Sequence, residues 1–137
     1  MDKMLWDNQM SVYFKPEEFA SPDNPESGYE MDYMFMDSLV NLRKFVNRPF
    51  VINSGFRTKE HNQSLIARGY EASPDSAHLK GLAVDIHIPD SSFLYGIIKY
   101  ALFLKFKRIG ISAKGKFIHL DMDEGLNKPQ EVIWLYE

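Results

Sequence analysis

Two segments in which apolar and polar residues alternate constrain this chain more than any other feature. Successive side chains of a β-strand point to opposite faces of the sheet. As strands, LAVDIHI (82–88) and KFIHLDM (116–122) each place aliphatic residues on one face and acidic and imidazole groups on the other. These polar groups are Asp85 and His87 in the first segment, and His119 and Asp121 in the second. If the two strands lie in one sheet, Asp85 and His119 converge.

The other segments predict helices and further strands around this pair. Helical spacing and end signals favour helices over 31–46, 58–69 and 91–104, with a short helix starting in KPEEFA (15–20). The apolar positions of 31–46, including its methionines, are expected to fill the core. Runs rich in β-formers predict strands at 49–53, 108–112 and 131–136, and 108–122 reads as a hairpin. The expected class is α+β, a small and mainly antiparallel sheet flanked by helices.

Composition favours one globular domain over residues 1–137, because 45% of the residues are hydrophobic. The net charge of −3 and the lack of any Lys/Arg block argue against nucleic-acid binding. No apolar run approaches the roughly 20 residues that cross a bilayer, so no membrane insertion is expected. The first residues have no apolar core of a secretory signal, so synthesis in the cytoplasm without a signal peptide is expected.

The residue types that remain for chemistry point to a metal. Cysteine is absent, which leaves imidazole and carboxylate as ligands. His78 lies in the loop that feeds the strand carrying Asp85, and His119 lies on the other strand. Two histidines and one carboxylate leave one position open, as in catalytic zinc sites. A solvent-facing polar side of the sheet would show a similar pattern, although Asp is depleted in strands and costly to bury without a partner.

Three segments in order, SGFRTKEHN (54–62), SAHLKGLAVDI (76–86) and KFIHLD (116–121), resemble the zinc D-Ala-D-Ala carboxypeptidase family and its phage relatives. The shared patterns are S-x-H-x-x-G-x-A-x-D and a later aliphatic-His-x-Asp. The resemblance extends from FKPEEFA (14–20) to a terminal strand with Trp134. It implies the hedgehog/DD-peptidase fold.

The resemblance also implies roles for individual residues. It makes His78, Asp85 and His119 the ligands of one Zn²⁺ ion. Arg57 matches the family arginine that holds a substrate carboxylate or carbonyl, a task suited to its planar fork of donors. Ser76 would fix the loop or contact the substrate. The alternatives are a solvated surface charge for Arg57 and a turn or capping residue for Ser76.

The general base is the point at which this chain departs from the better-known relatives. They place an acidic residue or a histidine shortly before the last His ligand, whereas this chain has lysine and phenylalanine there (116–117). Asp121 is the first candidate for the base and His87 the second, with Asp123 and Glu124 behind them. Alternatively, Asp121 does not act as the base but hydrogen-bonds to a His ligand and orients it, without binding the metal itself.

These features predict a zinc-dependent peptidase that hydrolyses amide bonds in bacterial peptidoglycan stem peptides or crosslinks. The sequence leaves open a D-Ala-D-Ala carboxypeptidase or an endolysin-type endopeptidase. A phage setting is expected, with action on the cell wall after release at lysis or as a virion component. The alternative is a non-catalytic, zinc-bound binding or structural module of the same fold.

A serine hydrolase using Ser76, His78 and Asp85 is the third reading. It is disfavoured because no G-x-S-x-G elbow is present. Ser76 and His78 also lie two residues apart in one loop, which is awkward for the required geometry.

Overall fold

The computed structural model describes residues 1–137, in which helices come before most of the strands. The α-helices are α1 (Lys3–Gln9), α2 (Tyr33–Val46), α3 (Lys59–Ala67) and α4 (Ser91–Phe103). Three short 3-10 helices are η1 (Pro16–Phe19), η2 (Ser27–Glu30) and η3 (Ala77–Lys80). The strands are β1 (Ile52–Ser54), β2 (Ala83–His87), β3 (Arg108–Ser112), β4 (Phe117–Asp121) and β5 (Val132–Leu135). The predicted α+β class is confirmed.

The five strands form one sheet in the order β1-β2-β4-β3-β5. All neighbours are antiparallel except β3 and β5, which are parallel, so the sheet is mainly antiparallel as predicted. The strands β2 and β4 pair in a register that sets Asp85 directly opposite His119. Gly110 of β3 lies on the other side of His119.

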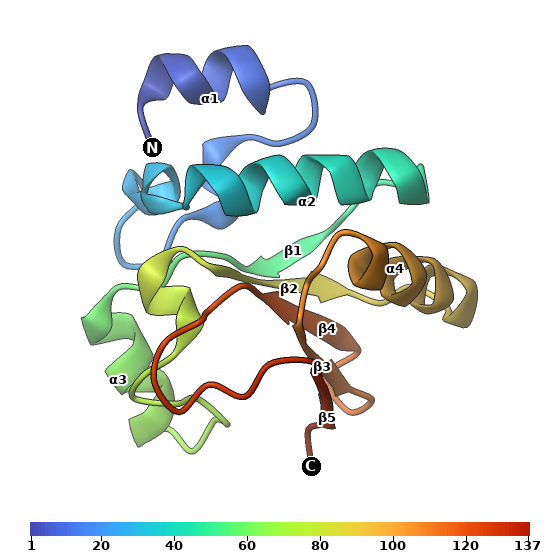
Figure 1. Cartoon of the computed structure of the whole chain (residues 1–137). Helices are drawn as coiled ribbons and strands as arrows, with labels where there is room; N and C mark the ends of the chain where they lie inside the picture. Colours follow the sequence, from blue (N-terminus) through green and yellow to red (C-terminus); the bar gives the residue numbers. More distant parts are fainter.

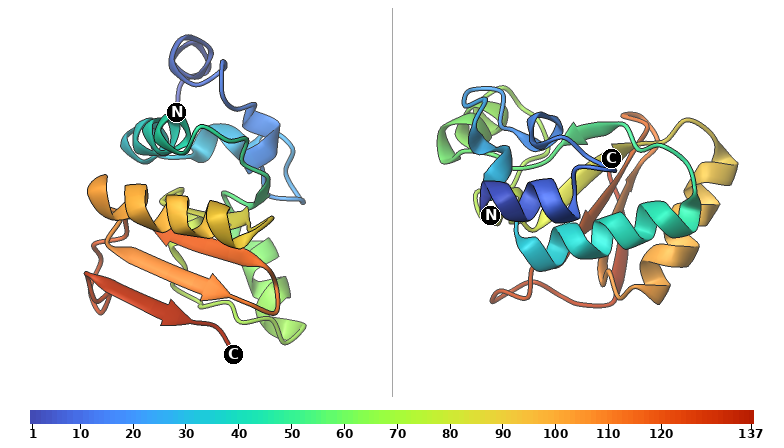
Figure 2. Two further views of the ribbon diagram at one scale, coloured as in Figure 1. Left: turned by 90° about the vertical axis from the view of Figure 1, so that its right-hand side faces the viewer. Right: turned by 90° about the horizontal axis from the view of Figure 1, so that it is seen from above.

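The two faces of the sheet have different roles. One face packs its aliphatic side chains, including Val84, Ile86, Ile118 and Leu120, into the main hydrophobic core. Figure 1 shows α1 and α2 stacked above β1 and β2 on this side, with α4 beside them, and Figure 2 shows the same layers from two further directions. α3 lies on the other side of the sheet. Because the aliphatic side chains of β2 and β4 point into the core, the polar side chains of these strands lie on the face turned toward α3.

Helix α2 shows both the strength and the limit of the predicted periodicity. It is capped by Asp32, whose carboxylate accepts from the backbone N–H of Phe35 at 2.9 Å. The core stripe is confirmed at Met31, Phe35, Leu39 and Leu42. The prediction was wrong for Met34, whose exposed fraction is 67%. The 100° step of the helix turns this position out of the stripe that faces the core.

Helix α1 was not predicted, since seven residues are too few to show a period. It is fixed instead by one side chain, Trp6, which is fully buried. The indole N–H donates to the carbonyl of Phe14 at 3.0 Å, and the ring packs edge-on against Phe19 and Tyr29. None of the helices combines the length and the hydrophobicity that spanning a bilayer requires.

Gly81 connects η3 to the start of β2 in a way that other residues cannot reproduce. Its φ of +68° lies in the left-handed region, and a Cβ there would stand 2.3 Å from the carbonyl oxygen of Glu30. Its own carbonyl accepts from the N–H of Asp32 at 3.0 Å. The contact brings the loop that carries His78 against the N-terminus of α2.

We predict that Gly81→Ala lowers the free energy of unfolding by about 1–3 kcal/mol, because it adds a steric clash to left-handed backbone strain. Gly69→Ala is the matched control, since Gly69 also has positive φ (+85°) but no atom lies within 4 Å of the added Cβ. Urea unfolding followed by circular dichroism measures both. Equal losses in the two variants would contradict the role of the close approach to Glu30.

Candidate metal centre

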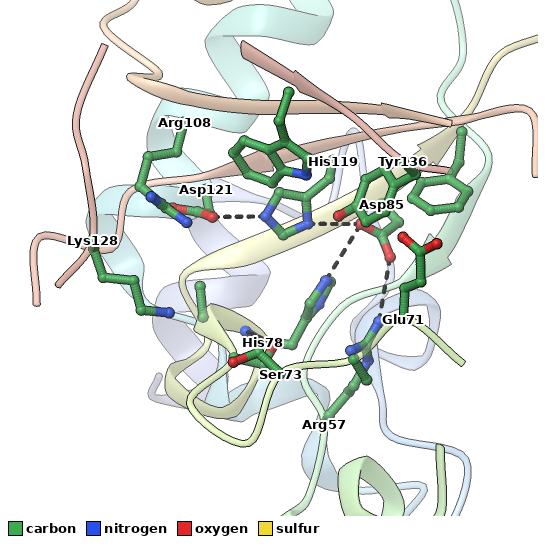
Figure 3. A pocket seen from close by; sticks show the side chains of 15 residues that line it. Arg57, Glu71, Ser73, His78, Asp85, Arg108, His119, Asp121, Lys128 and Tyr136 are labelled. Atoms are coloured by element: carbon green, nitrogen blue, oxygen red, sulfur yellow. Dashed lines mark hydrogen bonds and ion pairs between the residues drawn. The ribbon is translucent and has the colours of Figure 1, made fainter. Parts of the chain in front are cut away.

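His78, Asp85 and His119 meet in one cluster on the polar face of the sheet (Figure 3). Each offers one ligand atom, and these atoms all lie within 4.8 Å of one another. The three residues are buried, with exposed fractions of 2%, 7% and 6%. The structure thus brings together the three residues that the sequence predicted as metal ligands, from η3, β2 and β4.

His78 is oriented by two hydrogen bonds of its loop. Its backbone N–H donates to the hydroxyl of Ser76, the residue that caps η3. Its ring Nδ1 lies 2.6 Å from the carbonyl oxygen of Gly55. Because a carbonyl only accepts, Nδ1 carries the proton and Nε2 keeps a lone pair.

The Nε2 atom of His78 is the buried atom that this protein leaves without a hydrogen bond. It lies 3.3 Å from a carboxylate oxygen of Asp85, close but not in hydrogen-bonding geometry. An unsatisfied buried acceptor costs free energy unless another partner supplies the missing interaction. A metal ion between His78, Asp85 and His119 would supply it, so the donor set fits such an ion.

His119 is held between two carboxylates. Its Nδ1 lies 2.9 Å from Oδ1 of Asp85, and its Nε2 lies 2.7 Å from Oδ2 of Asp121. With Nε2–H donating to Asp121, Nδ1 is the nitrogen directed at the cluster. A carboxylate behind a ligating histidine is a common device that fixes the ring and raises its basicity.

The electrostatics keep the cluster ready for a cation. Burial lowers the pKa of His78, so its ring stays neutral with a free lone pair. Burial alone would raise the pKa of Asp85, but the two histidines outweigh it and hold that pKa far below its usual value. Burial also opposes protonation of His119, yet its hydrogen bonds to Asp121 and Asp85 raise the pKa to about 9. A metal binding here would displace that proton.

Asp121 is occupied on both oxygens. One accepts from His119, and the other accepts from the guanidinium of Arg108 at 2.8 Å and from the backbone N–H of Asp123 at 3.1 Å. Its exposed fraction is 1%. Of the two roles considered for Asp121, the geometry therefore favours orienting His119 over taking a proton from water.

Arg57 lies at the edge of the cluster, and its side chain is only 13% exposed. Its guanidinium group contacts Ser54 at 3.1 Å and, at a longer 3.4 Å, Asn62 and Asp85. Asn62 is buried and donates to the carbonyl of Ser73, so it ties Arg57 to the segment 69–77. Sequence reasoning missed Asn62, whose only signal was a polar residue on an otherwise ordinary helix.

Two cavities adjoin the cluster. The inner cavity, about 220 Å³, has the cluster, Arg57 and Ser76 in its wall. The outer cavity, about 700 Å³, lies between α3 and the β3–β4 hairpin, with His61 and Lys114 in its wall. They share a boundary made by Arg57, Glu71, Ala72, Asp85, Phe117 and Tyr136. His87, the second candidate for the base, is half-buried and lines neither of them.

Trp134 covers His119 from the edge of the sheet, an arrangement made possible by a glycine. The indole and imidazole ring centroids lie 5.4 Å apart. Gly110 separates the two residues, and a Cβ there would stand 2.6 Å from the indole. Sequence reasoning did not connect Trp134 with His119, because the contact depends on which strand lies next to β3.

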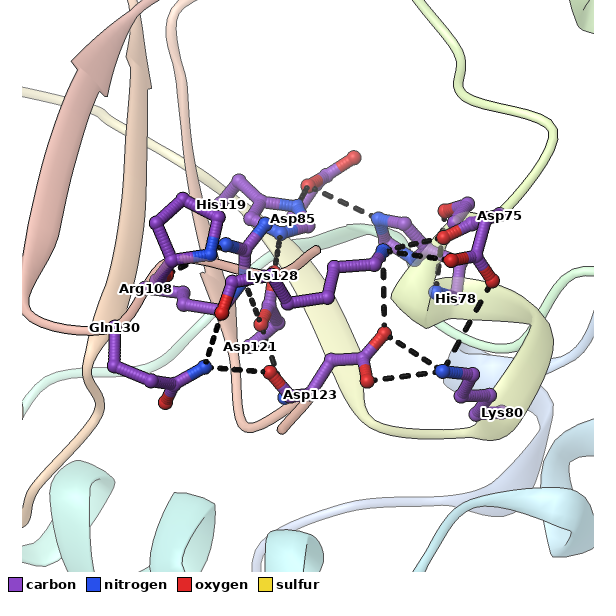
Figure 4. A network of polar contacts seen from close by, with 12 residues as sticks. Asp75, His78, Lys80, Asp85, Arg108, His119, Asp121, Asp123, Lys128 and Gln130 are labelled. Atoms are coloured by element: carbon purple, nitrogen blue, oxygen red, sulfur yellow. Dashed lines mark hydrogen bonds and ion pairs between the residues drawn. The ribbon is translucent and has the colours of Figure 1, made fainter. Parts of the chain in front are cut away.

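A second polar network closes the far side of the site (Figure 4). Asp123 is buried and pairs with Lys80 at 2.9 Å and with Lys128 at 3.2 Å. Lys128 also donates to the carbonyl of Asp75, and Gln130 donates to the carbonyl of Asp123. The network fastens residues 123–130 to the loop before His78. Because its carboxylate is engaged in these ion pairs, Asp123 is not available to act as the base.

The profile of the peptidase M15 family matches residues 12–121, which include all three residues of the cluster. The chain belongs to this family. Peptidoglycan L,D-endopeptidase MepK of Escherichia coli (strain K12) is 31% identical over 93 residues, which cover 66% of this chain and 50% of the relative. MepK of Shigella flexneri gives the same values. The chain spans about half the length of these relatives, and membership in the M15 family confirms the resemblance seen in the sequence motifs.

We predict that this M15 family member binds one zinc ion per chain and that His78→Ala, Asp85→Ala and His119→Ala each abolish stoichiometric binding. Each change removes one of three ligands from a site that has no spare one nearby. His87→Ala is the control, from the same strand as Asp85. Zinc is measured by mass spectrometry after dialysis of protein whose fold is checked by circular dichroism. Folded variants that all keep their zinc would refute the ligand set.

We predict that Asp121→Asn weakens zinc binding about 10- to 100-fold, because the ring of His119 loses its charged partner. Competition with a chromophoric chelator measures the affinity. Glu124→Gln is the control, since Glu124 is exposed and lines neither cavity. An affinity within twofold of the wild type would remove the orienting role and restore Asp121 as a candidate base.

Proposed function

We propose that the protein is a zinc-dependent peptidase that hydrolyses amide bonds in the peptides of bacterial peptidoglycan. The observation that carries the proposal is the buried His78–Asp85–His119 cluster, whose one orphaned nitrogen faces the other two ligand atoms beside an accessible cavity. Membership in the peptidase M15 family supports the reaction type. The name of MepK, a peptidoglycan L,D-endopeptidase, supports the substrate class.

The residues around the cluster match the needs of amide hydrolysis. A zinc ion, when bound, polarises a carbonyl and makes water a better nucleophile at neutral pH. Arg57 presents guanidinium donors at the cavity boundary, where they would hold a carbonyl or carboxylate of the peptide. Tyr136 stands on the same boundary, and burial raises its pKa to about 12, so its phenol stays protonated and can donate.

The shape of the site favours internal cleavage over removal of a terminal residue. All three residues of the cluster line the inner cavity, and one of them, Asp85, also lines the outer cavity. A peptide that extends from the inner cavity past Asp85 into the outer cavity would have room on both sides of its scissile bond, as an endopeptidase requires. The endopeptidase assignment is thus our choice between the two activities left open by the sequence. Release at phage lysis or presence in a virion stays a prediction.

A non-catalytic zinc module is the competing function, and one observation favours it. No acidic residue or histidine stands just before His119, and Asp121 is engaged on both oxygens. A site with bound zinc and no proton acceptor would bind a peptide without cutting it.

We predict that the zinc-loaded protein releases peptide fragments from purified peptidoglycan and that a chelator abolishes the release. Mass spectrometry of the soluble products identifies the bond that is cut. His119→Ala protein serves as the matched control for contaminating hydrolases. Absence of fragments from several wall types, with folded and zinc-bound protein, would overturn the peptidase and favour the binding module.

A further inference from the structure

Amide hydrolysis needs a group that accepts a proton from the attacking water and returns it to the leaving nitrogen. Five carboxylate or imidazole side chains line the inner cavity, namely Glu71, His78, Asp85, His119 and Asp121. Three of them form the cluster that would hold the metal ion, and their lone pairs would then be committed to it. The choice therefore lies between Asp121 and Glu71.

Asp121 is excluded by its contacts. Both of its oxygens accept charge-assisted hydrogen bonds, at 2.7 Å from His119 and 2.8 Å from Arg108, and no part of it faces open solvent. Taking up a proton would break one of these bonds and leave Arg108 half-buried without its partner.

The other polar residues of the inner cavity are also engaged or carry a proton already. Lys128 is a cation that pairs with Asp123 at 3.2 Å, so it cannot accept. Tyr136 keeps its phenolic proton at neutral pH. Both can donate to a substrate, but neither can take a proton from water.

Glu71 differs from all of these. It is exposed, it makes no hydrogen bond or ion pair with another residue, and it lies on the boundary shared by the two cavities. Figure 3 shows Glu71 at the side of the cluster where Asp85 lies, together with Arg57 and Tyr136. A peptide passing across the cluster from one cavity to the other must cross this boundary.

The segment that carries Glu71 is anchored on both sides of it. Before it, the N–H of Tyr70 donates to the carbonyl of Leu65 at 3.0 Å at the end of α3. After it, the carbonyl of Ser73 accepts from Asn62 at 2.9 Å, and the carbonyl of Asp75 accepts from Lys128. These bonds hold the segment at the mouth of the site and leave the carboxylate of Glu71 free.

We propose that Glu71 is the general base of the peptidase reaction, supplied by the segment after α3 rather than by the strand that carries His119. The inference rests on the proposed function. The carboxylate of Glu71 takes one proton from water as the water oxygen bonds to the scissile carbonyl carbon. When the carbon–nitrogen bond breaks, Glu71 passes that proton to the leaving amine nitrogen. Water is the only co-reactant, and the products are one carboxylic acid and one amine.

The test compares Glu71→Gln, Glu71→Asp and the control Glu60→Gln, which alters an exposed glutamate of α3 that lines neither cavity. The substrate is the peptide identified in the peptidoglycan digest, and kcat and KM are measured over pH 5–9. Two readouts independent of turnover are zinc content and calorimetric binding of an analogue in which a methylene-amine replaces the scissile amide.

We expect Glu71→Gln to keep stoichiometric zinc and to bind the analogue within about twofold of the wild type, while kcat falls about 10²- to 10⁴-fold. Glu71→Asp should recover part of the rate, and Glu60→Gln should match the wild type.

Two results would overturn the base assignment while leaving the peptidase intact. One is a Glu71→Gln variant with at least half of the wild-type kcat. The other is a variant whose loss in kcat/KM equals its loss in analogue affinity, which would make Glu71 a substrate-binding residue. A zinc-bound wild type that cuts no peptide would instead refute the peptidase itself, and the base with it.

Discussion

The pairing of β2 with β4 positions both the hydrophobic core and the polar cluster. Its register sets Asp85 opposite His119 and, on the reverse face, directs aliphatic residues into the core. Because side chains alternate, a slip of one residue would carry the carboxylate into the core and an aliphatic side chain to the site. The register of β2 and β4 therefore accounts both for the burial of Val84 and Ile118 and for the geometry of the cluster.

Much of this arrangement could be predicted from sequence because it follows from local periodicity. The alternation in 82–88 and 116–122 identified both strands and the residues on their polar face, and the motif around His78 supplied the third member of the cluster. The strand expected at 49–53 forms at 52–54 instead. Pro49 and Phe50 precede it, and proline cannot donate to a strand ladder.

The features that escaped prediction all depend on contacts between distant segments. Whether Asp121 is free or engaged depends on Arg108, thirteen residues away on β3. The contact of Trp134 with His119 depends on the parallel placement of β5 beside β3. Glu71 gave no signal in the sequence, because an exposed glutamate in a loop is ordinary until the loop is seen to border a cavity. Local pattern therefore identified the residues of the cluster, whereas their surroundings had to come from the three-dimensional structure.

The distribution of the two tryptophans has a practical consequence. Trp6 is sealed in the hydrophobic core, where its indole bonds to the backbone of Phe14. Trp134 packs against the imidazole of His119, in the wall of the inner cavity. The intrinsic fluorescence of this protein thus combines one emitter that senses the integrity of the core with another that senses the chemistry of the cluster. Replacing Trp6 or Trp134 by phenylalanine, one at a time, would separate the two signals and turn the unlabelled chain into its own optical probe.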